Sequence, residues 1–169
     1  VHLFGNPVPL APIQQLAAAA GALLIEDAAQ GIGGAWAGRP LGAAGDLGVL
    51  SFGRGKGVTG GAGGALLLNA PSLLPWQPTL EEGRASRLKS ALALTAQWAM
   101  GRPTLYGIPA SIPWLGLGET PFHAPHEPVA MSPFSARALT RTWPLAFEEA
   151  EQRRANVQSR WAAPSSECT

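Results

Sequence analysis

The stretch LGVLSFGRGKGVTGGAGGALLLN, residues 47–69, places two apolar runs on either side of a glycine-rich loop. Short apolar runs bounded by glycine are typical of buried strands, so we expect strands over LGVLSF (47–52) and GALLLN (64–69). The connection, of roughly ten residues, lacks a helical pattern, and a parallel crossover normally needs a dozen residues or more. The two strands are therefore expected to be antiparallel or joined by a short irregular return.

A helix and a third strand are expected upstream of this pair. APIQQLAAAAG (11–21) has Pro12 in its first turn, where a missing N–H is tolerated, and Gly21 at a position that favours positive φ. ALLIED (22–27) follows at once and is predicted as a buried strand that ends in two carboxylates. A helix followed by a short apolar strand is the rhythm of a mostly parallel sheet with helices, so the expected fold class is α/β.

Two helical segments are expected downstream of the glycine-rich loop. Residues 80–101 and 134–161 have helical spacing, and Pro144 should kink or break the second segment. Residues 102–133 contain many of the prolines and are predicted to be irregular.

Composition limits the classes of partner. The chain has 169 residues, of which 46% are hydrophobic and 14% charged, and its net charge is +1. Such a chain is globular, with room for one domain or for one domain and part of another, and it offers no basic surface to nucleic acid. No apolar run reaches the length of a membrane span. We therefore expect neither nucleic acid nor a membrane among the partners.

The cysteine content and the first residues suggest a location and a fragment. Cys168 is the single cysteine, so no internal disulfide can form, which suits a reducing, cytoplasmic compartment. The chain opens on VHLFG rather than on Met, as if a strand or loop were already under way. We therefore expect a fragment or a partial gene product.

Three common motifs fit this chain poorly. Lys56 resembles the lysine of a phosphate-binding P-loop, but Leu50 and Gly57 stand where that motif requires glycine and serine or threonine. GKGVTG fits G-x-G-x-x-G by its letters, yet a strand follows it instead of the helix that would hold a pyrophosphate. His123 and His126 lack a cluster of further ligands, so we interpret them as exposed loop residues and expect no metal.

Four polar side chains follow the predicted strands. Asp27 and Gln30 come after LLIE, and Ser51 and Lys56 come after LGVL. In open α/β sheets ligands bind at the carboxyl ends of the strands, so neighbouring strands would bring these groups to one edge. The set suits pyridoxal phosphate, which needs an amine for its aldehyde, a carboxylate for its pyridine nitrogen and donors for its phosphate. A structural alternative stays open, in which Asp27 caps a helix, Ser51 caps a strand and Lys56 is solvated.

From Val1 to Asn69 the sequence resembles the DegT/DnrJ/EryC1/StrS aminotransferases. The EDAAQ block, the GDLG turn, the SF…K spacing and the GGALL strand carry the resemblance, and MSPFSARAL…FEEAEQRRAN resembles a later helix of that family. The resemblance implies an incomplete part of the large domain of a pyridoxal-phosphate enzyme with the aspartate-aminotransferase fold. It assigns residues 1–150 to the C-terminal part of that domain, and residues 151–169 to a connecting helix and the start of a truncated small domain.

The resemblance also implies a role for each of the four residues. Lys56 would bond to the cofactor aldehyde, and Asp27 would pair with the pyridine nitrogen. Gln30 would lie against the cofactor ring or its hydroxyl, and Ser51 would bind the phosphate. Because some relatives that dehydrate sugars carry histidine in place of this lysine, Lys56 favours transamination.

The implied substrates are an amino donor such as glutamate and a keto sugar linked to a nucleotide, for polysaccharide or secondary-metabolite sugar biosynthesis. The full-length protein would be a homodimer, since the family's site borrows residues from a second subunit. The chain departs from the family at Gly53, Arg54 and Gly55, where an aromatic and a small polar residue are usual. The alternative function is that of a degenerate, non-catalytic member acting as a binding or oligomerisation module.

Overall fold

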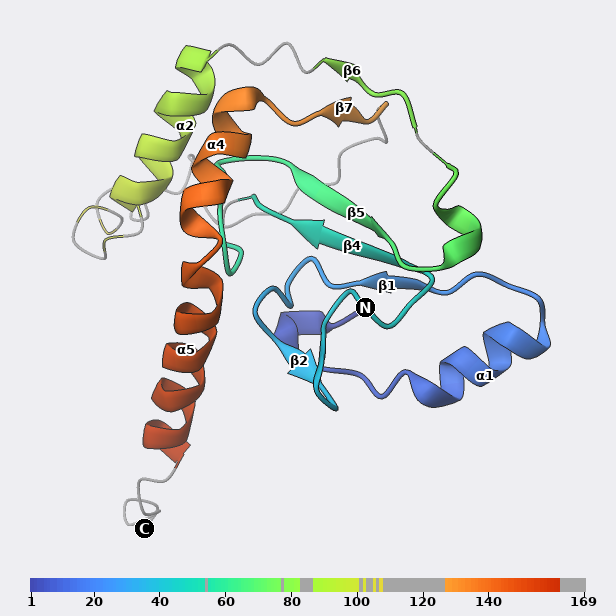
Figure 1. The fold of residues 1–169 in the computed structure, drawn as a ribbon. Coiled ribbons are helices and arrows are strands. Elements are labelled where there is room, and N and C mark those ends of the chain that lie inside the picture. Colours follow the sequence, from blue (N-terminus) through green and yellow to red (C-terminus); the bar gives the residue numbers. More distant parts are fainter. Residues whose placement is uncertain are drawn as a thin grey trace.

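The computed structural model describes residues 1–53, 55–76, 78–82, 87–100, 102, 105, 107 and 127–161. At its centre is a three-stranded sheet in the order β1 (Ile25–Asp27), β4 (Leu47–Ser51) and β5 (Gly64–Leu68) (Figure 1). β1 runs parallel to β4, whereas β5 runs antiparallel to it. The expected antiparallel return across the glycine-rich loop is thus confirmed, and the sheet of the α/β fold is mixed.

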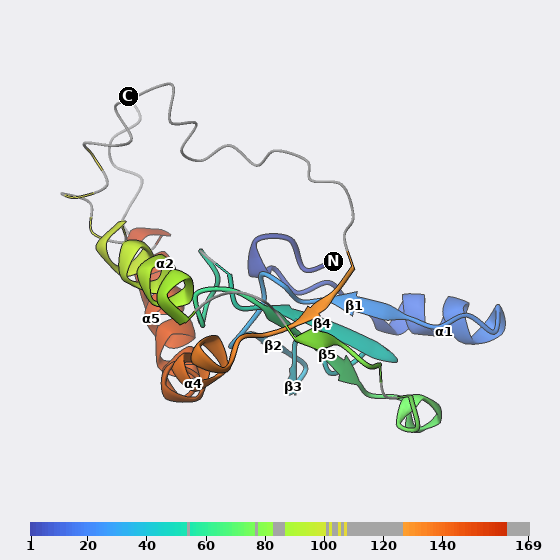
Figure 2. The ribbon, with the colours of Figure 1, turned by 90° about the horizontal axis from the view of Figure 1, so that it is seen from above.

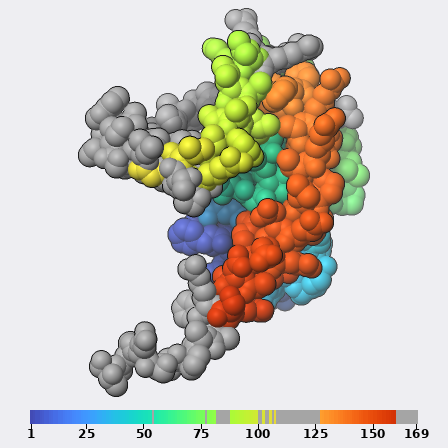
Figure 3. All heavy atoms as spheres, turned by 90° about the vertical axis from the view of Figure 1, so that its left-hand side faces the viewer, coloured from blue at the N-terminus to red at the C-terminus, as the bar shows by residue number. Residues whose placement is uncertain are grey.

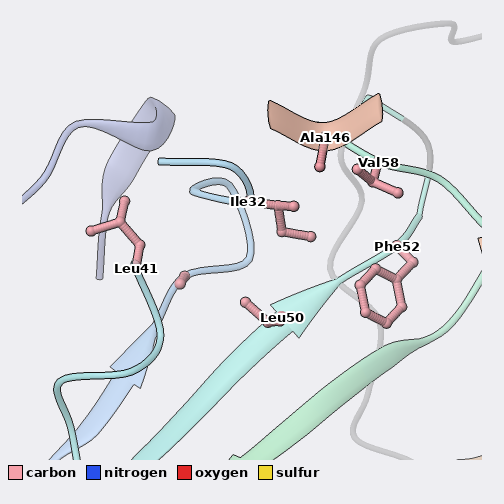
Figure 4. Packing of buried hydrophobic residues seen from close by; sticks show 7 residues of the cluster. Ile32, Leu41, Leu50, Phe52, Val58 and Ala146 are labelled. Carbon is pink, nitrogen blue, oxygen red and sulfur yellow. The ribbon is translucent and has the colours of Figure 1, made fainter. Parts of the chain in front are cut away.

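The two faces of this sheet differ in burial. Leu50 and Phe52 point to the covered face, where they belong to a core cluster whose other members are Ala28, Ile32, Leu41, Val58 and Ala146 (Figure 4). Ile25 lies on the opposite face and is 60% exposed. The strand predicted over 22–27 is therefore confirmed only for its last three residues. Its expected burial holds for Glu26 and is wrong for Ile25, because successive residues of a pleated strand point to opposite faces.

Three of the helices follow the predicted segments. The helix expected over 11–21 is α1 (Ala11–Ala19). The segment 134–161 forms two helices, α4 (Pro133–Thr142) and α5 (Leu145–Trp161). The break falls at Pro144, whose ring and missing N–H are incompatible with an uninterrupted helix.

A further helix, α2 (Arg87–Met100), begins later than predicted. Residues Glu81–Glu82 form β6, which pairs in parallel with β7 (Val129–Ala130). The prediction of helix from residue 80 is therefore wrong at its start. The remaining short elements are η1 (Leu3–Gly5), η2 (Pro71–Leu73) and the hairpin strands β2 (Ala35–Trp36) and β3 (Arg39–Pro40).

The helices are unevenly distributed around the sheet. α2, α4 and α5 gather at one side of it, and α1 lies at the other (Figure 2). α4 and α5 follow each other as one column on the face shown in Figure 3, with α2 against α4. β1 and β4 both point toward this column in Figure 1, so their carboxyl ends face α5. None of the described helices combines the length and apolar character needed to cross a bilayer.

Candidate active site

The carboxyl ends of β1 and β4 lie side by side because the two strands are parallel neighbours. Asp27 ends β1 and pairs with Val49, and Ser51 ends β4 two residues further on. Side chains two residues apart in a strand point to the same face of the sheet, so Ser51 shares the face of Val49 and of its partner Asp27. Ideal strand spacings separate their Cα atoms by about 8 Å. The structure therefore meets the condition on which the predicted site depends, that these strands are neighbours.

The backbone around Asp27 fixes one of its carboxylate oxygens. Oδ1 accepts a hydrogen bond from the N–H of Ala29 at 3.0 Å. The Asp27 carbonyl accepts the N–H of His2 at 2.9 Å, which ties the first residues of the chain to β1. Oδ2 accepts no hydrogen bond from any residue that the structure describes. The carboxylate is half-buried, and one of its oxygens is open to a ligand.

Gln30 lies beside the first loop of the chain. Its Oε1 accepts the N–H of Phe4 at 2.7 Å, which leaves the side-chain amide NH₂ free to donate elsewhere. Phe4 has a φ of +56°, a left-handed conformation that is uncommon for a bulky residue. Gly5 follows with a backbone so close to Gln30 that a Cβ would stand 2.9 Å from the Gln30 carbonyl oxygen. The tight turn before Pro7 therefore needs glycine at this position.

The loop that carries Lys56 is closed around the carbonyl of Phe52. That carbonyl accepts the N–H of Gly60 at 3.1 Å and the hydroxyl of Thr59 at 2.9 Å. The Thr59 hydroxyl oxygen in turn accepts the N–H of Gly61 at 3.0 Å. Lys56 is half-buried at the far end of this loop, and no hydrogen bond or ion pair joins its Nζ to the part of the chain that the structure describes.

Gly57 brings the Lys56 loop against two other segments. A Cβ on Gly57 would lie 2.9 Å from the carbonyl oxygen of Ile32 and 3.1 Å from Nη2 of Arg153. Ile32 is two residues beyond Gln30, and Arg153 belongs to α5. The structure thus brings the Asp27, Gln30, Ser51 and Lys56 segments to one edge of the sheet. Their individual roles stay predictions, and Arg54, His123 and His126 lie outside the described residues.

Glu26 is a residue of this edge that sequence reasoning missed. Its side chain is 2% exposed, and its two oxygens accept four hydrogen bonds. His2 donates to Oε1 at 2.8 Å, as does the Gly42 N–H at 2.8 Å, and the N–H groups of Ala44 and Gly45 reach Oε2 at 2.7 and 2.9 Å. The carboxylate therefore fastens β1 to the loop before β4 and to the start of the chain.

His2 has a defined tautomer in this arrangement. Its Nδ1 accepts the N–H of Val8 at 3.1 Å, so the ring proton lies on Nε2 and is donated to Glu26. The sequence indicated Glu26 only as a carboxylate inside an apolar run, directly before Asp27. The hydrogen-bond partners of Glu26 lie 16 to 24 residues away in the sequence, so no local pattern predicts them.

The pKa of Glu26 lies below its ordinary value. Burial alone raises the pKa of this carboxyl group, but the N–H donors of Gly42 and Gly45, the His2 ring and the Ala44 N–H favour the ionised form and outweigh it. Glu26 is therefore an ionised anchor behind the site, while Asp27, next along the strand, points to the open face.

Comparison with known proteins identifies relatives of the first half of the chain. The model of the DegT/DnrJ/EryC1/StrS aminotransferase family matches residues 1–81. The chain is 36% identical over 73 residues to a GDP-perosamine synthase of Escherichia coli O157:H7. It is 38% identical over 74 residues to a dTDP-3-amino-3,4,6-trideoxy-alpha-D-glucose transaminase of Streptomyces venezuelae. Each match covers 43% of this chain and 20% of the relative, so the chain spans about a fifth of the length of these curated relatives.

A solved structure shares the fold over most of the chain. The DegT DnrJ EryC1 StrS aminotransferase from Brucella abortus superposes with a TM-score of 0.56 and 24% identity, over 94% of this chain and 35% of that one. The expected fold class is confirmed, since this chain is an incomplete α/β fold that matches part of that aminotransferase. Residues 1–81 of this chain are therefore similar to the DegT/DnrJ/EryC1/StrS aminotransferases.

Proposed function

We propose that this chain carries one wall of the active site of a pyridoxal-phosphate-dependent aminotransferase. The proposal depends on one observation. Because β1 and β4 are parallel neighbours, Asp27, Ser51 and the Lys56 loop lie at the same edge of the sheet. A carboxylate, a hydroxyl and an amine are the groups that this cofactor requires of a protein. The match of the aminotransferase family model to residues 1–81 supports the same function.

The residues present fit the cofactor. Oδ2 of Asp27 is open to the protonated pyridine nitrogen, because Oδ1 is already held by the Ala29 N–H. The hydroxyl of Ser51 would donate to the phosphate, and the free amide NH₂ of Gln30 would donate to the ring hydroxyl. When bound, pyridoxal phosphate supplies an aldehyde that receives and returns an amino group and a ring that withdraws electrons.

Lys56 would hold the cofactor through Nζ and, once released by the amino donor, would move protons as a general base and acid. Nζ must be neutral to take a proton from the Cα of the donor.

The substrates we propose are an amino acid such as glutamate and a keto sugar linked to a nucleotide, for polysaccharide or secondary-metabolite sugar biosynthesis. The names of the two relatives, a GDP-linked synthase and a dTDP-linked transaminase, support this class of substrate. We propose a homodimer in the working protein. The division into 1–150 and 151–169 stays a prediction, and its boundary falls inside α5.

The experiment is reductive trapping with an internal control. The full chain is mixed with pyridoxal phosphate and reduced with borohydride, and the modified lysine is located by mass spectrometry. Lys56 and Lys89 are the two lysines of the sequence, so each digest reports the specific and the background reaction together. We expect the adduct on Lys56 in clear excess over Lys89, and a reduced excess in Asp27→Asn.

Equal labelling of the two lysines would contradict the proposal, since it would mean that the Lys56 loop offers nothing beyond a reactive amine. A dimer that persists in Lys56→Ala, together with the absence of any adduct in the parent chain, would favour the binding or oligomerisation module instead.

A further inference from the structure

We infer that the cleft between α5 and the first loop of the chain is an oxyanion-binding site, in which Arg153 and Arg154 take the carboxylate or phosphate of a substrate. The cleft has a volume of about 430 Å³, which falls in the range of small-molecule sites. This inference deepens the proposed function, on which the identity of the anion rests.

One face of α5 forms the first wall. The residues that line the cleft from this helix are Ala150, Arg153, Arg154, Val157 and Gln158, spaced as one helical stripe. The acidic residues of α5, Glu148, Glu149 and Glu151, do not line it. The wall therefore presents two guanidinium groups, and no carboxylate of α5 lines it.

The guanidinium groups are available to a ligand. Nε of Arg153 donates to the carbonyl of Glu149 at 3.0 Å, which orients the side chain and leaves the two terminal nitrogens as donors. No ion pair joins Arg153 or Arg154 to a carboxylate within the ranges that the structure describes. A planar pair of N–H donors without a partner matches the geometry of a carboxylate or phosphate.

The opposite wall adds donors and no negative charge. It is built from the loop at Phe4–Pro7 and from the segment that starts at Gln30. The free amide NH₂ of Gln30 and the side chain of Asn6 are its polar groups. Both walls therefore favour an anion.

The cleft adjoins the lysine loop. Arg153 lines the cleft and also lies against Gly57, the residue after Lys56. An anion held by Arg153 would thus bring the rest of its molecule to the edge where Gln30 and Lys56 meet. The carboxylate of an amino donor and the phosphate of a nucleotide sugar share this chemistry.

Isothermal titration of the full chain, without pyridoxal phosphate, tests the inference. Glutarate serves as the carboxylate probe and inorganic pyrophosphate as the phosphate probe, both at neutral pH and low salt. We expect saturable binding, with Kd raised about tenfold in Arg153→Gln and in Arg154→Gln, because each change removes charge-assisted hydrogen bonds. Arg141→Gln, which removes the same charge from an exposed position on α4, should change Kd less than about twofold.

The two probes distinguish the sources of the anion. Tighter binding of glutarate assigns the cleft to the amino donor, and tighter binding of pyrophosphate assigns it to the nucleotide. Arg153→Lys keeps the charge and should recover part of the affinity, while circular dichroism confirms that each variant is folded. A parent chain that binds neither probe, or an equal loss in Arg141→Gln, would overturn the inference.

The oxyanion site and the proposed function can be refuted independently of each other. Lys56 does not line the cleft, so the titration and the trapping of pyridoxal phosphate on Lys56 report on two different sets of residues. Binding without any adduct on Lys56 would remove the aminotransferase proposal alone. An adduct on Lys56 without binding would remove the oxyanion site alone.

Discussion

Replacing Glu26 by glutamine removes the negative charge of the anchor behind the site while keeping its shape. The amide oxygen can still accept from His2 and Gly42, but the NH₂ group then faces the N–H groups of Ala44 and Gly45. Each buried polar group left without a partner costs about 1–3 kcal/mol, so the two N–H groups together cost about 2–6 kcal/mol. We expect the free energy of unfolding to fall by about 3–5 kcal/mol, a large share of the stability of a typical domain.

Urea denaturation at neutral pH, followed by circular dichroism, measures this loss. Glu148→Gln is the matched control, because it makes the same chemical change at an exposed position in the first turn of α5 and should cost less than about 0.5 kcal/mol. A loss below about 1 kcal/mol in Glu26→Gln would refute the reasoning, since four hydrogen bonds to a buried carboxylate would then contribute almost nothing net.

Three further predictions concern pH, backbone contact and packing. Folding lowers the pKa of Glu26, so the ionised carboxylate stabilises the folded state above the unfolded-state pKa of about 4.3. This stabilisation is lost as the pH falls through the folded-state pKa. The urea midpoint should therefore fall more steeply with decreasing pH for the parent chain than for Glu26→Gln. Gly48→Ala would drive a Cβ into the carbonyl oxygen of Gly42, and the urea midpoint should show a loss of about 3 kcal/mol or more. Phe52→Ala should cost about 3–5 kcal/mol in thermal or urea unfolding, and a double-mutant cycle with Trp143→Leu should give a coupling of about 1 kcal/mol, because the two rings meet edge to face at 6.1 Å.

The strands and the glycine-rich return could be predicted from the sequence because their signals are local. Residues 47–52 and 64–69 are apolar runs with glycine at their borders, and the short connection excluded a parallel crossover. Pro144 likewise marked the break between α4 and α5 by its own chemistry. In each case the residues that determine the structure lie within the segment itself.

The parts that were missed depend on distant partners. β6 forms because residues 81–82 meet residues 129–130, and nothing in the local pattern of either segment indicates that pairing. The same holds for Glu26, whose donors come from the start of the chain and from the loop before β4. Arg153 was read only as part of a helix, because its place against Gly57 depends on how α5 packs.

α5 is fixed in the core near its N-terminal end. Ala146 is 1% exposed and is the residue of this helix that enters the core, whereas Arg153 stands about 10 Å further along the axis. A tilt of about 10° around Ala146 would therefore displace Arg153 by about 2 Å, enough to make or break a hydrogen bond to an anion. The distance between Arg153 and the Lys56 loop therefore depends on the angle at which α5 leaves Ala146.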